Sequence, residues 1–439
     1  MFKTTFKISV RAVERWMPDP LLFAYILTIL SAVAAMVFMK SSPADVMTYW
    51  GDSIWNLLAF AMQMVLIVVS GFVLSTTPLF SRLLNSFASL ATTPVKAIFL
   101  VCLGTLTASW LNWGLGLIVG AVLARRIAIR VQNVDYRLLV ASAYSGWLVF
   151  HGGLSGSIPL LIATPGHFLE ESIGVVPISS TLFTPFNLAI VIALFIAVPA
   201  INLLMLRGID NPVFVDAEKL LEEEKTNVDD RNETLADRIE NSWLLSLIIG
   251  GTALIYVVHS LWTGKSGLNI NVVNLLFLSV GIILHGTPRR FLAALNEGVK
   301  HVSGIVIQFP FYAGIMGIMS MSGLSAALSD FFINVASATT LPVWSFLSAG
   351  FLNLFIPSGG GQWAVQGPIM MEAAQQLGAD IPRVAMATAW GDAWTNLIQP
   401  FWALPILAIA GLKARDIMGF CMMHTLVSAS IIIVCLLLI

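Results

Sequence analysis

Residues 351–371 read FLNLFIPSGGGQWAVQGPIMM, and they interrupt a long apolar stretch, about 342–378, with a proline, a serine and three consecutive glycines. A second apolar stretch, about 94–127, is interrupted by SWLNWGLG at residues 109–116. Each stretch exceeds the roughly 20 residues that one membrane-spanning helix needs. A broken backbone at bilayer depth is tolerated only inside protein or beside a wet cavity. A helical hairpin that enters and leaves the membrane on the same side fits both stretches.

The composition indicates a chain whose surface mostly faces lipid. Of the 439 residues, 57% are hydrophobic and 11% are charged, whereas a soluble domain carries about 25% charged residues. The three cysteines lie in apolar runs without a pairing pattern, which argues against a disulfide framework or a cysteine metal site. Two segments, 78–93 and 287–300, are predicted to lie on the cytoplasmic surface of the membrane. Membrane-spanning helices are expected near 21–39, 55–77, 138–163, 184–206, 243–262, 270–286, 302–326, 385–411 and 418–438.

The lysines and arginines predict the orientation of the chain. When the N-terminus is cytoplasmic and both interrupted stretches are re-entrant, only Lys40, Lys265 and Arg383 of the 23 basic residues fall outside. Basic residues accumulate on the cytoplasmic side of membrane proteins, so this arrangement is favoured. It predicts a cytoplasmic N-terminus and a periplasmic C-terminus. The basic segment 3–15 precedes a first helix that is too long for a signal peptide, so we expect this helix to be retained.

The two halves of the chain resemble each other. An internal repeat at a fixed offset indicates a duplicated structural unit. Because one extra helix, 243–262, lies between the copies, the second copy is expected to enter the membrane from the opposite side. Inverted repeats of this kind place the binding site near mid-membrane, between discontinuous helices of both halves. Three segments match in the same order at an offset of about 245: 63–83 with 308–328, 106–112 with 347–353, and 137–144 with 383–390.

The predicted fold is therefore an all-α polytopic membrane protein in which an inverted repeat carries two re-entrant helical hairpins and two broken transmembrane helices. Residues 207–269 are predicted to form an acidic cytoplasmic loop followed by the linker helix. The two repeats are predicted as residues 1–206, with a hairpin at about 94–127 and a broken helix at 138–163, and residues 270–439, with a hairpin at about 342–378 and a broken helix at 385–411.

Polar residues gather at the four interruptions. Hairpin tips present unpaired N–H groups and the positive end of a half-helix to an anion, and oxygens of unwound segments can ligate a cation. The alternative is that the glycines only permit tight turns or close helix packing. The residues expected to bind the coupling ion are Asp392, Thr395 and Asn396. The residues expected to bind substrate are Ser109, Asn112, Gly114, His151, Ser358, Gly359, Gly360, Gly361 and Gln362.

Two of these side chains can carry charge within a span. A carboxylate there costs ~2.5–3.5 kcal/mol on insertion scales, so Asp392 is expected to face a cavity and to couple transport to an ion or proton. A structural hydrogen bond to a broken helix end is the alternative. His151 can titrate near neutral pH and bind substrate or a proton, or it can simply satisfy the break. No lysine or arginine lies in the four interruptions. Such a site suits a small monoanion with an apolar tail, and the aromatic residues expected beside it are Trp113, Trp147, Trp363 and Trp394.

The stretch 351–371, together with GDAWTN at 391–396, resembles the bacterial short-chain fatty acid transporter family. Members of this family are associated with uptake of acetoacetate and butyrate, and the similarity runs along nearly the whole chain. The wider ion transporter superfamily also includes dicarboxylate/sodium symporters. The resemblance implies two oppositely facing hairpins, a moving transport domain and a scaffold that usually dimerises. Sodium-coupled dicarboxylate members carry Ser-Asn-Thr at both tips, whereas this sequence has Asn-Trp-Gly at 112–114 and Ser-Gly-Gly at 358–360.

These observations predict a secondary active transporter of short-chain monocarboxylates in the bacterial inner membrane. We expect coupling to H⁺ or Na⁺, an elevator-type movement and a homodimer in the lipid bilayer. We expect no cofactor, no metal other than a coupling Na⁺ and no nucleic-acid partner. Alternatives are a cation/proton antiporter that exchanges at Asp392, a dicarboxylate/sodium symporter and a passive channel. An enzyme is not expected, because the six histidines are scattered and no H-E-x-x-H motif occurs.

Overall fold

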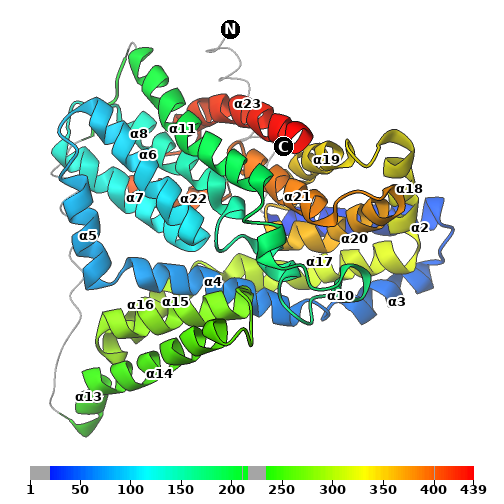
Figure 1. Cartoon of the computed structure of the whole chain (residues 1–439), viewed down its shortest axis with the longest axis horizontal. Helices are drawn as coiled ribbons and strands as arrows, with labels where there is room; N and C mark the ends of the chain where they lie inside the picture. Colours follow the sequence, from blue (N-terminus) through cyan, green and yellow to red (C-terminus); the bar gives the residue numbers. More distant parts are fainter. Residues whose placement is uncertain (1–19, 210, 216–233, 400) are drawn as a thin grey trace.

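The computed structural model describes residues 20–209, 211–215, 234–399 and 401–439. Within these residues the chain forms only helices and the turns that join them (Figure 1). The basic segment 3–15 and most of the acidic loop after residue 215 lie outside the described residues, so the predictions that concern them are not tested here.

The helices of the first half begin with a spanning helix and end with another. In chain order they are α2 (Pro20–Phe38), α3 (Pro43–Ser53), α4 (Leu58–Ser75), α5 (Pro78–Ala88), α6 (Pro94–Leu111), α7 (Trp113–Arg130), α8 (Tyr136–Ser145), the 3₁₀ helix η1 (Gly146–Gly152), α9 (Ser157–Ile162), α10 (Glu170–Ile173), η2 (Ile178–Ser180) and α11 (Pro185–Arg207).

The second half repeats this order of long, short, paired and broken helices. After α13 (Leu235–Glu240) and α14 (Trp243–Trp262) come α15 (Ile270–His285), α16 (Pro288–Val299), α17 (Ser303–Met321), α18 (Leu324–Val335), α19 (Leu341–Asn353), α20 (Gly359–Leu377), α21 (Ile381–Asn396), α22 (Ala403–Ala410) and α23 (Ala414–Leu438).

Seven of the described helices are long and apolar enough to cross a membrane, judged by length and composition. These helices make the chain a multi-pass membrane protein. One predicted span, 302–326, is too long: α17 ends at Met321, because Gly323 takes the left-handed conformation (φ 83°) and starts α18 in a new direction. The short helix α3 also forms where no helix was predicted, with Ser42 as its N-cap. The seven candidate spans are α2, α4, α6, α11, α14, α17 and α23.

The prediction of two helical hairpins is confirmed. In the first hairpin a single extended residue, Asn112, joins α6 to α7 and accepts a hydrogen bond from the Leu115 N–H (2.9 Å). In the second hairpin residues 354–358 join α19 to α20, and Ser358 caps α20. Figure 1 shows α6 and α7 toward one end of the long axis and α19 and α20 toward the other. Trp113, next to the first turn, and Ser358, in the second turn, line one pocket, so the two turns lie close to each other.

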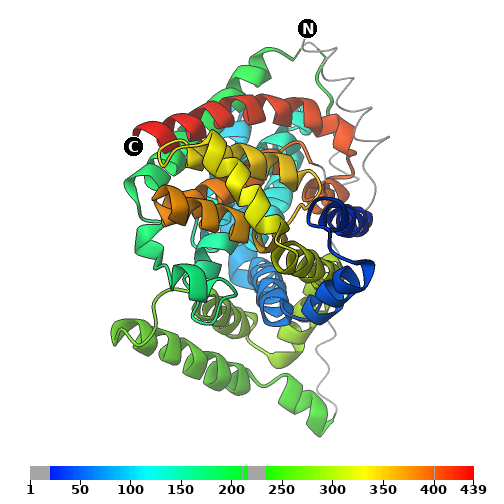
Figure 2. The same cartoon turned by 90° about the vertical axis from the view of Figure 1, so that its right-hand side faces the viewer.

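The two broken helices are also confirmed. The first consists of α8, η1 and α9, and the second consists of α21 and α22, separated at residues 397–402. Both breaks occur where the sequence changes from apolar to small and polar residues. Figure 2 shows that α14 (green) lies at one edge of the molecule and α23 (red) at the opposite edge, with the hairpins and broken helices between them. The breaks are thus enclosed by protein, as their unpaired backbone groups require.

Candidate functional site

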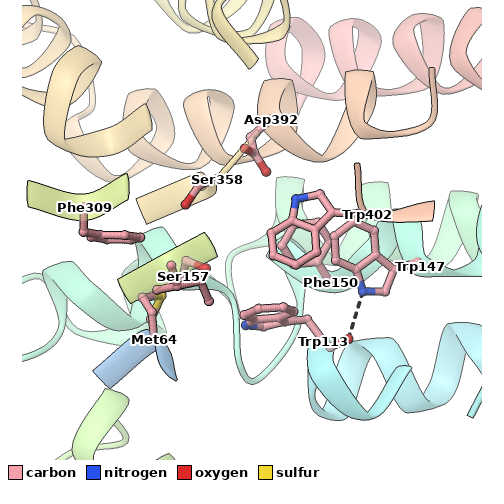
Figure 3. Close-up of a pocket in the computed structure, with 11 residues that line it drawn as sticks. Met64, Trp113, Trp147, Phe150, Ser157, Phe309, Ser358, Asp392 and Trp402 are labelled. Atoms are coloured by element: carbon pink, nitrogen blue, oxygen red, sulfur yellow. Dashed lines mark hydrogen bonds between the residues drawn. The ribbon is translucent and has the colours of Figure 1, made fainter. Parts of the chain in front are cut away.

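A cavity lies where the second hairpin tip meets the two broken helices. It contains about 330 Å³ of space between atoms, of which the centre of a water molecule can reach about 20 Å³. That is room for about one water molecule. Figure 3 shows Asp392 and Ser358 on one side of this cavity and Trp113 on another. The lining residues are Met64, Trp113, Trp147, Phe150, Ser157, Ile305, Phe309, Ser358, Gly359, Asp392 and Trp402.

Asp392 lines the cavity and forms a buried pair with His151, which lies behind it and does not line the cavity. Both side chains have no exposed surface, and the His151 Nε2 lies 2.9 Å from the Asp392 Oδ2. The Asn396 amide donates a second hydrogen bond to the same oxygen (3.1 Å). Among the described residues, the Asp392 Oδ1 and the His151 Nδ1 have no hydrogen-bond partner. One carboxylate oxygen is therefore held, while the other is available to a ligand.

The N-terminus of α20 reaches this pair through Gly359. A Cβ atom at this position would stand 2.5 Å from the His151 Nε2 and 3.5 Å from the Asp392 Oδ2, so only glycine allows the backbone to come this close. The Ser358 Oγ accepts a hydrogen bond from the Gly361 N–H (3.4 Å) and lines the cavity. The positive end of the α20 dipole thus faces the cavity, where it favours negative charge.

The remaining predicted residues of the second tip pack away from the cavity. A Cβ at Gly360 would stand 2.6 Å from the Phe60 ring, and one at Gly361 would overlap the Tyr312 ring. The Gln362 amide donates to the Ala349 carbonyl (3.0 Å) and thereby ties α20 to α19. These three residues let the hairpin pack closely, and the structure gives them no direct position at the site.

The first tip reaches the cavity through Trp113 rather than through the predicted residues. Ser109 packs against Gly116 inside the hairpin, Asn112 caps α7, and Gly114 packs against Val68. Their neighbour Trp113 lines the cavity and is 5% exposed. Its indole N–H has no partner among the described residues. The sequence showed the broken segment but could not show which of its side chains points inward.

Thr395 and Asn396 support Asp392 but do not line the cavity. The Thr395 hydroxyl donates to the Gly350 carbonyl (2.9 Å). The Asn353 amide donates to the Thr395 Oγ1 (3.0 Å) and to the Asn396 Oδ1 (2.9 Å). These contacts fasten α21 to α19 and fix the orientation of the Asn396 amide toward Asp392.

Aromatic rings form the apolar wall of the cavity. Trp147 stacks on Phe150 with a centroid distance of 4.3 Å, and Trp113 meets Trp402 edge-on at 5.3 Å. The Trp402 indole N–H donates to the Pro357 carbonyl (2.8 Å), which links the second break to the second tip. Sequence reasoning missed Phe150 and Trp402, although both lie in the interrupted segments.

Two tryptophans that were expected at the site lie elsewhere. Trp363 is fully buried beside Gly367, and Trp394 packs against Phe346 and donates to the Thr425 carbonyl (2.7 Å). Neither residue lines the cavity.

A larger cavity adjoins the first one. The two share Ile305 and Trp402, and the larger one is also lined by Ser303, Gln308 and Leu404. It offers about 570 Å³ to the centre of a water molecule. Trp402 therefore borders both cavities. Across the described part of the chain, no three His, Cys, Asp or Glu side chains come together in a way that could hold a metal ion.

Comparisons with known proteins find transporters that are similar to this chain in sequence and in fold. The model of the family described as "Short chain fatty acid transporter" matches residues 1–439. A protein of Escherichia coli (strain K12) named "Putative short-chain fatty acid transporter" is 44% identical over 98% of both chains. A protein of Haemophilus influenzae with the same name is 42% identical over 99% of this chain and 97% of its own. The crystal structure of the Alcanivorax borkumensis YdaH transporter shares the fold, with a TM-score of 0.55, 17% identity and coverage of 95% of this chain and 98% of that chain.

Proposed function

The chain belongs to the short-chain fatty acid transporter family, and from this membership we propose that it takes up short-chain monocarboxylates such as butyrate or acetoacetate by secondary active transport. The observation that carries the proposal is the cavity between the tips, which combines hydrogen-bond donors with an aromatic wall. Among its lining residues there is no lysine or arginine. A second carboxylate on the substrate would lack a fixed cation, so a monoanion fits best.

The proposed pose places the substrate carboxylate between the two tips. The Trp113 indole N–H, the Ser358 hydroxyl and the first-turn N–H groups of α20 are the donors available to it. The short acyl chain would lie against Trp147 and Trp402. The other tip residues, Ser109, Asn112, Gly114, Gly360, Gly361 and Gln362, would act by shaping the two hairpins rather than by direct contact.

The coupling ion, H⁺ or Na⁺, would bind at Asp392. His151 contacts this carboxylate directly, and Thr395 and Asn396 brace it. A carboxylate buried at this depth is typical of ion-coupling sites. Binding of the cation beside the anion would reduce the electrostatic penalty of carrying either charge alone through a region of low dielectric constant.

We propose that transport proceeds by an elevator-type movement of the hairpins and broken helices. The recurring order of elements supports two inverted repeats, residues 1–206 and 270–439, joined by the loop and linker helix of 207–269. The two tips border one cavity from opposite ends of the molecule, so each tip can serve as the gate for one side. The N-terminus would be cytoplasmic and the C-terminus periplasmic. The assembly would be a homodimer, and cross-linking in membranes can test this.

Counterflow in proteoliposomes tests the proposed substrate. Vesicles loaded with unlabelled butyrate should accumulate labelled butyrate or acetoacetate transiently, above the signal of protein-free vesicles. Succinate should compete at least tenfold less well than butyrate. Saturable succinate uptake without butyrate counterflow would show that the substrate is a dicarboxylate and not a monocarboxylate. Rates that do not saturate would indicate a channel.

One observation favours a second candidate function. The buried His151–Asp392 pair could exchange cations for protons without any organic anion, as in a cation/proton antiporter. Proton flux driven by a Na⁺ or K⁺ gradient in vesicles free of carboxylate would support that function and would contradict the monocarboxylate proposal.

A further inference from the structure

The contacts of Asp392 distinguish between the two coupling ions. Both groups that contact its Oδ2 are nitrogens: the His151 Nε2 at 2.9 Å and the Asn396 Nδ2 at 3.1 Å. Small hard cations are bound by several oxygen ligands, such as carboxylates, carbonyls and waters. At Oδ2, therefore, nitrogen donors occupy the places where such a cation would need further oxygens.

Three neighbouring oxygens face one amide nitrogen, that of Asn353. The Asn353 amide nitrogen faces three oxygens: the Asp392 carbonyl (3.0 Å), the Thr395 Oγ1 (3.0 Å) and the Asn396 Oδ1 (2.9 Å). Turning the Asn396 amide round would place its oxygen against the Asp392 carboxylate and its nitrogen against the Asn353 nitrogen. Both new contacts would be repulsive, so the network fixes the Asn396 nitrogen toward Asp392.

The other titratable groups around the pair are weak acids. Tyr144 of α8 is within electrostatic reach of Asp392 and of Cys421 on α23, and its hydroxyl donates to the Asn396 carbonyl (2.6 Å). Tyr312 of α17 stands over the second tip at Gly361. Asp392 is the one acidic or basic residue among those that line the cavity. His151 and Asp392 are therefore the groups that can take up a proton at this site.

We propose that the coupling ion is a proton, which the His151–Asp392 pair carries across the membrane together with one monocarboxylate. The inference rests on the proposed function and names its coupling ion. The pair without the added proton consists of a carboxylate and a neutral imidazole, with a charge of −1. Adding one proton and one substrate anion leaves the charge at −1. The loaded and empty forms of the site then carry equal charge, so one cycle moves one proton and one anion electroneutrally.

Wild-type proteoliposomes test this directly. Initial uptake of labelled acetoacetate should proceed without Na⁺ and should rise severalfold with an alkaline interior, above the rate of protein-free vesicles, which reports passive permeation of the acid. A potential imposed with valinomycin and K⁺ should leave the rate unchanged. Uptake driven by a Na⁺ gradient at equal pH, or uptake that follows the potential, would overturn the proposal.

Two variants assign the proton to the pair. His151→Gln keeps an amide donor for Asp392 but cannot take up a proton, and Asp392→Asn imitates the protonated carboxyl. In both variants the ratio of pH-driven uptake to counterflow is expected to fall at least tenfold below the wild-type ratio. The matched control is His424→Gln, a buried histidine on α23 that contacts Asn202 outside the cavity, and it should keep pH-driven uptake. Normal pH-driven uptake by both site variants would overturn the proposal. If the wild type shows no counterflow, the proposed function itself fails.

Discussion

Gly359→Ala is the smallest change that alters the site directly. The added methyl group would stand 2.5 Å from the His151 Nε2, whereas an ordinary contact begins at 3.4 Å. The imidazole or the tip of α20 must therefore move by about 0.9 Å. Gly359 has no left-handed φ angle, so backbone strain plays no part in the effect. At the first position of a helix, alanine is also a better helix former than glycine.

The displacement predicts the size of the effect on transport. A misplacement of about 1 Å among positioned groups lowers the rate of an oriented step by roughly 10²-fold. We therefore expect Gly359→Ala to reduce the initial rate of counterflow by ~10- to 100-fold, because the contact between His151 and Asp392 is disturbed together with the donors of α20.

The assay compares purified variants in proteoliposomes at equal protein density. Gly251→Ala is the matched control, because a Cβ at Gly251 meets nothing within 4 Å and α14 lies at the edge of the molecule. This control should transport as fast as the wild type. Size-exclusion profiles establish that both variants are folded. A Gly359→Ala rate within twofold of the wild type would refute the argument that the close approach of Gly359 to His151 matters.

Three further changes test other contacts. Trp113→Phe removes an indole donor but keeps an aromatic ring. Loss of a hydrogen bond to a charged group costs about 1.5–3 kcal/mol, so the apparent KM should be at least ~10-fold higher. An unchanged KM would exclude Trp113 as a carboxylate ligand. Trp402→Phe removes the hydrogen bond to the Pro357 carbonyl. Such a hydrogen bond typically contributes about 0.5–1.5 kcal/mol, so efflux of preloaded substrate should be ~2- to 10-fold faster. Efflux at the wild-type rate would contradict a gating role for Trp402. Outside the spanning helices, the Thr234 hydroxyl, followed by Arg289, lowers the pKa of Asp237 to about 2. Because the pKa of Asp237 is depressed, its stabilisation of the folded state is present at neutral pH and is lost as pH falls from about 4 toward 2. Asp237→Asn should therefore raise the rate of hydrogen exchange in α13 at pH 7. An unchanged exchange rate would contradict this expectation.

The architecture was largely predictable because the membrane imposes a simple rule on the sequence. Spans need long apolar runs, and interruptions at bilayer depth must be enclosed, so the hairpins and broken helices were recognisable from residues such as Asn112 and Pro357. Errors occurred where a turn depends on local backbone geometry. The end of α17 before Gly323 is an example, since apolar residues resume directly after the change of direction and make the two helices read as one span.

By itself, the sequence determined that the chain is an all-helical membrane protein with two interrupted hairpins and that Asp392 lies in a broken span. Only the tertiary structure decided which side chains meet. His151 and Asp392 are 241 positions apart, and their contact depends on how the two halves pack. The same packing directs the Trp113 side chain into the cavity. Asn112 instead caps α7, and Gln362 links α20 to α19. Hydropathy records whether a segment is buried, but not the direction in which a side chain points once several helices surround it.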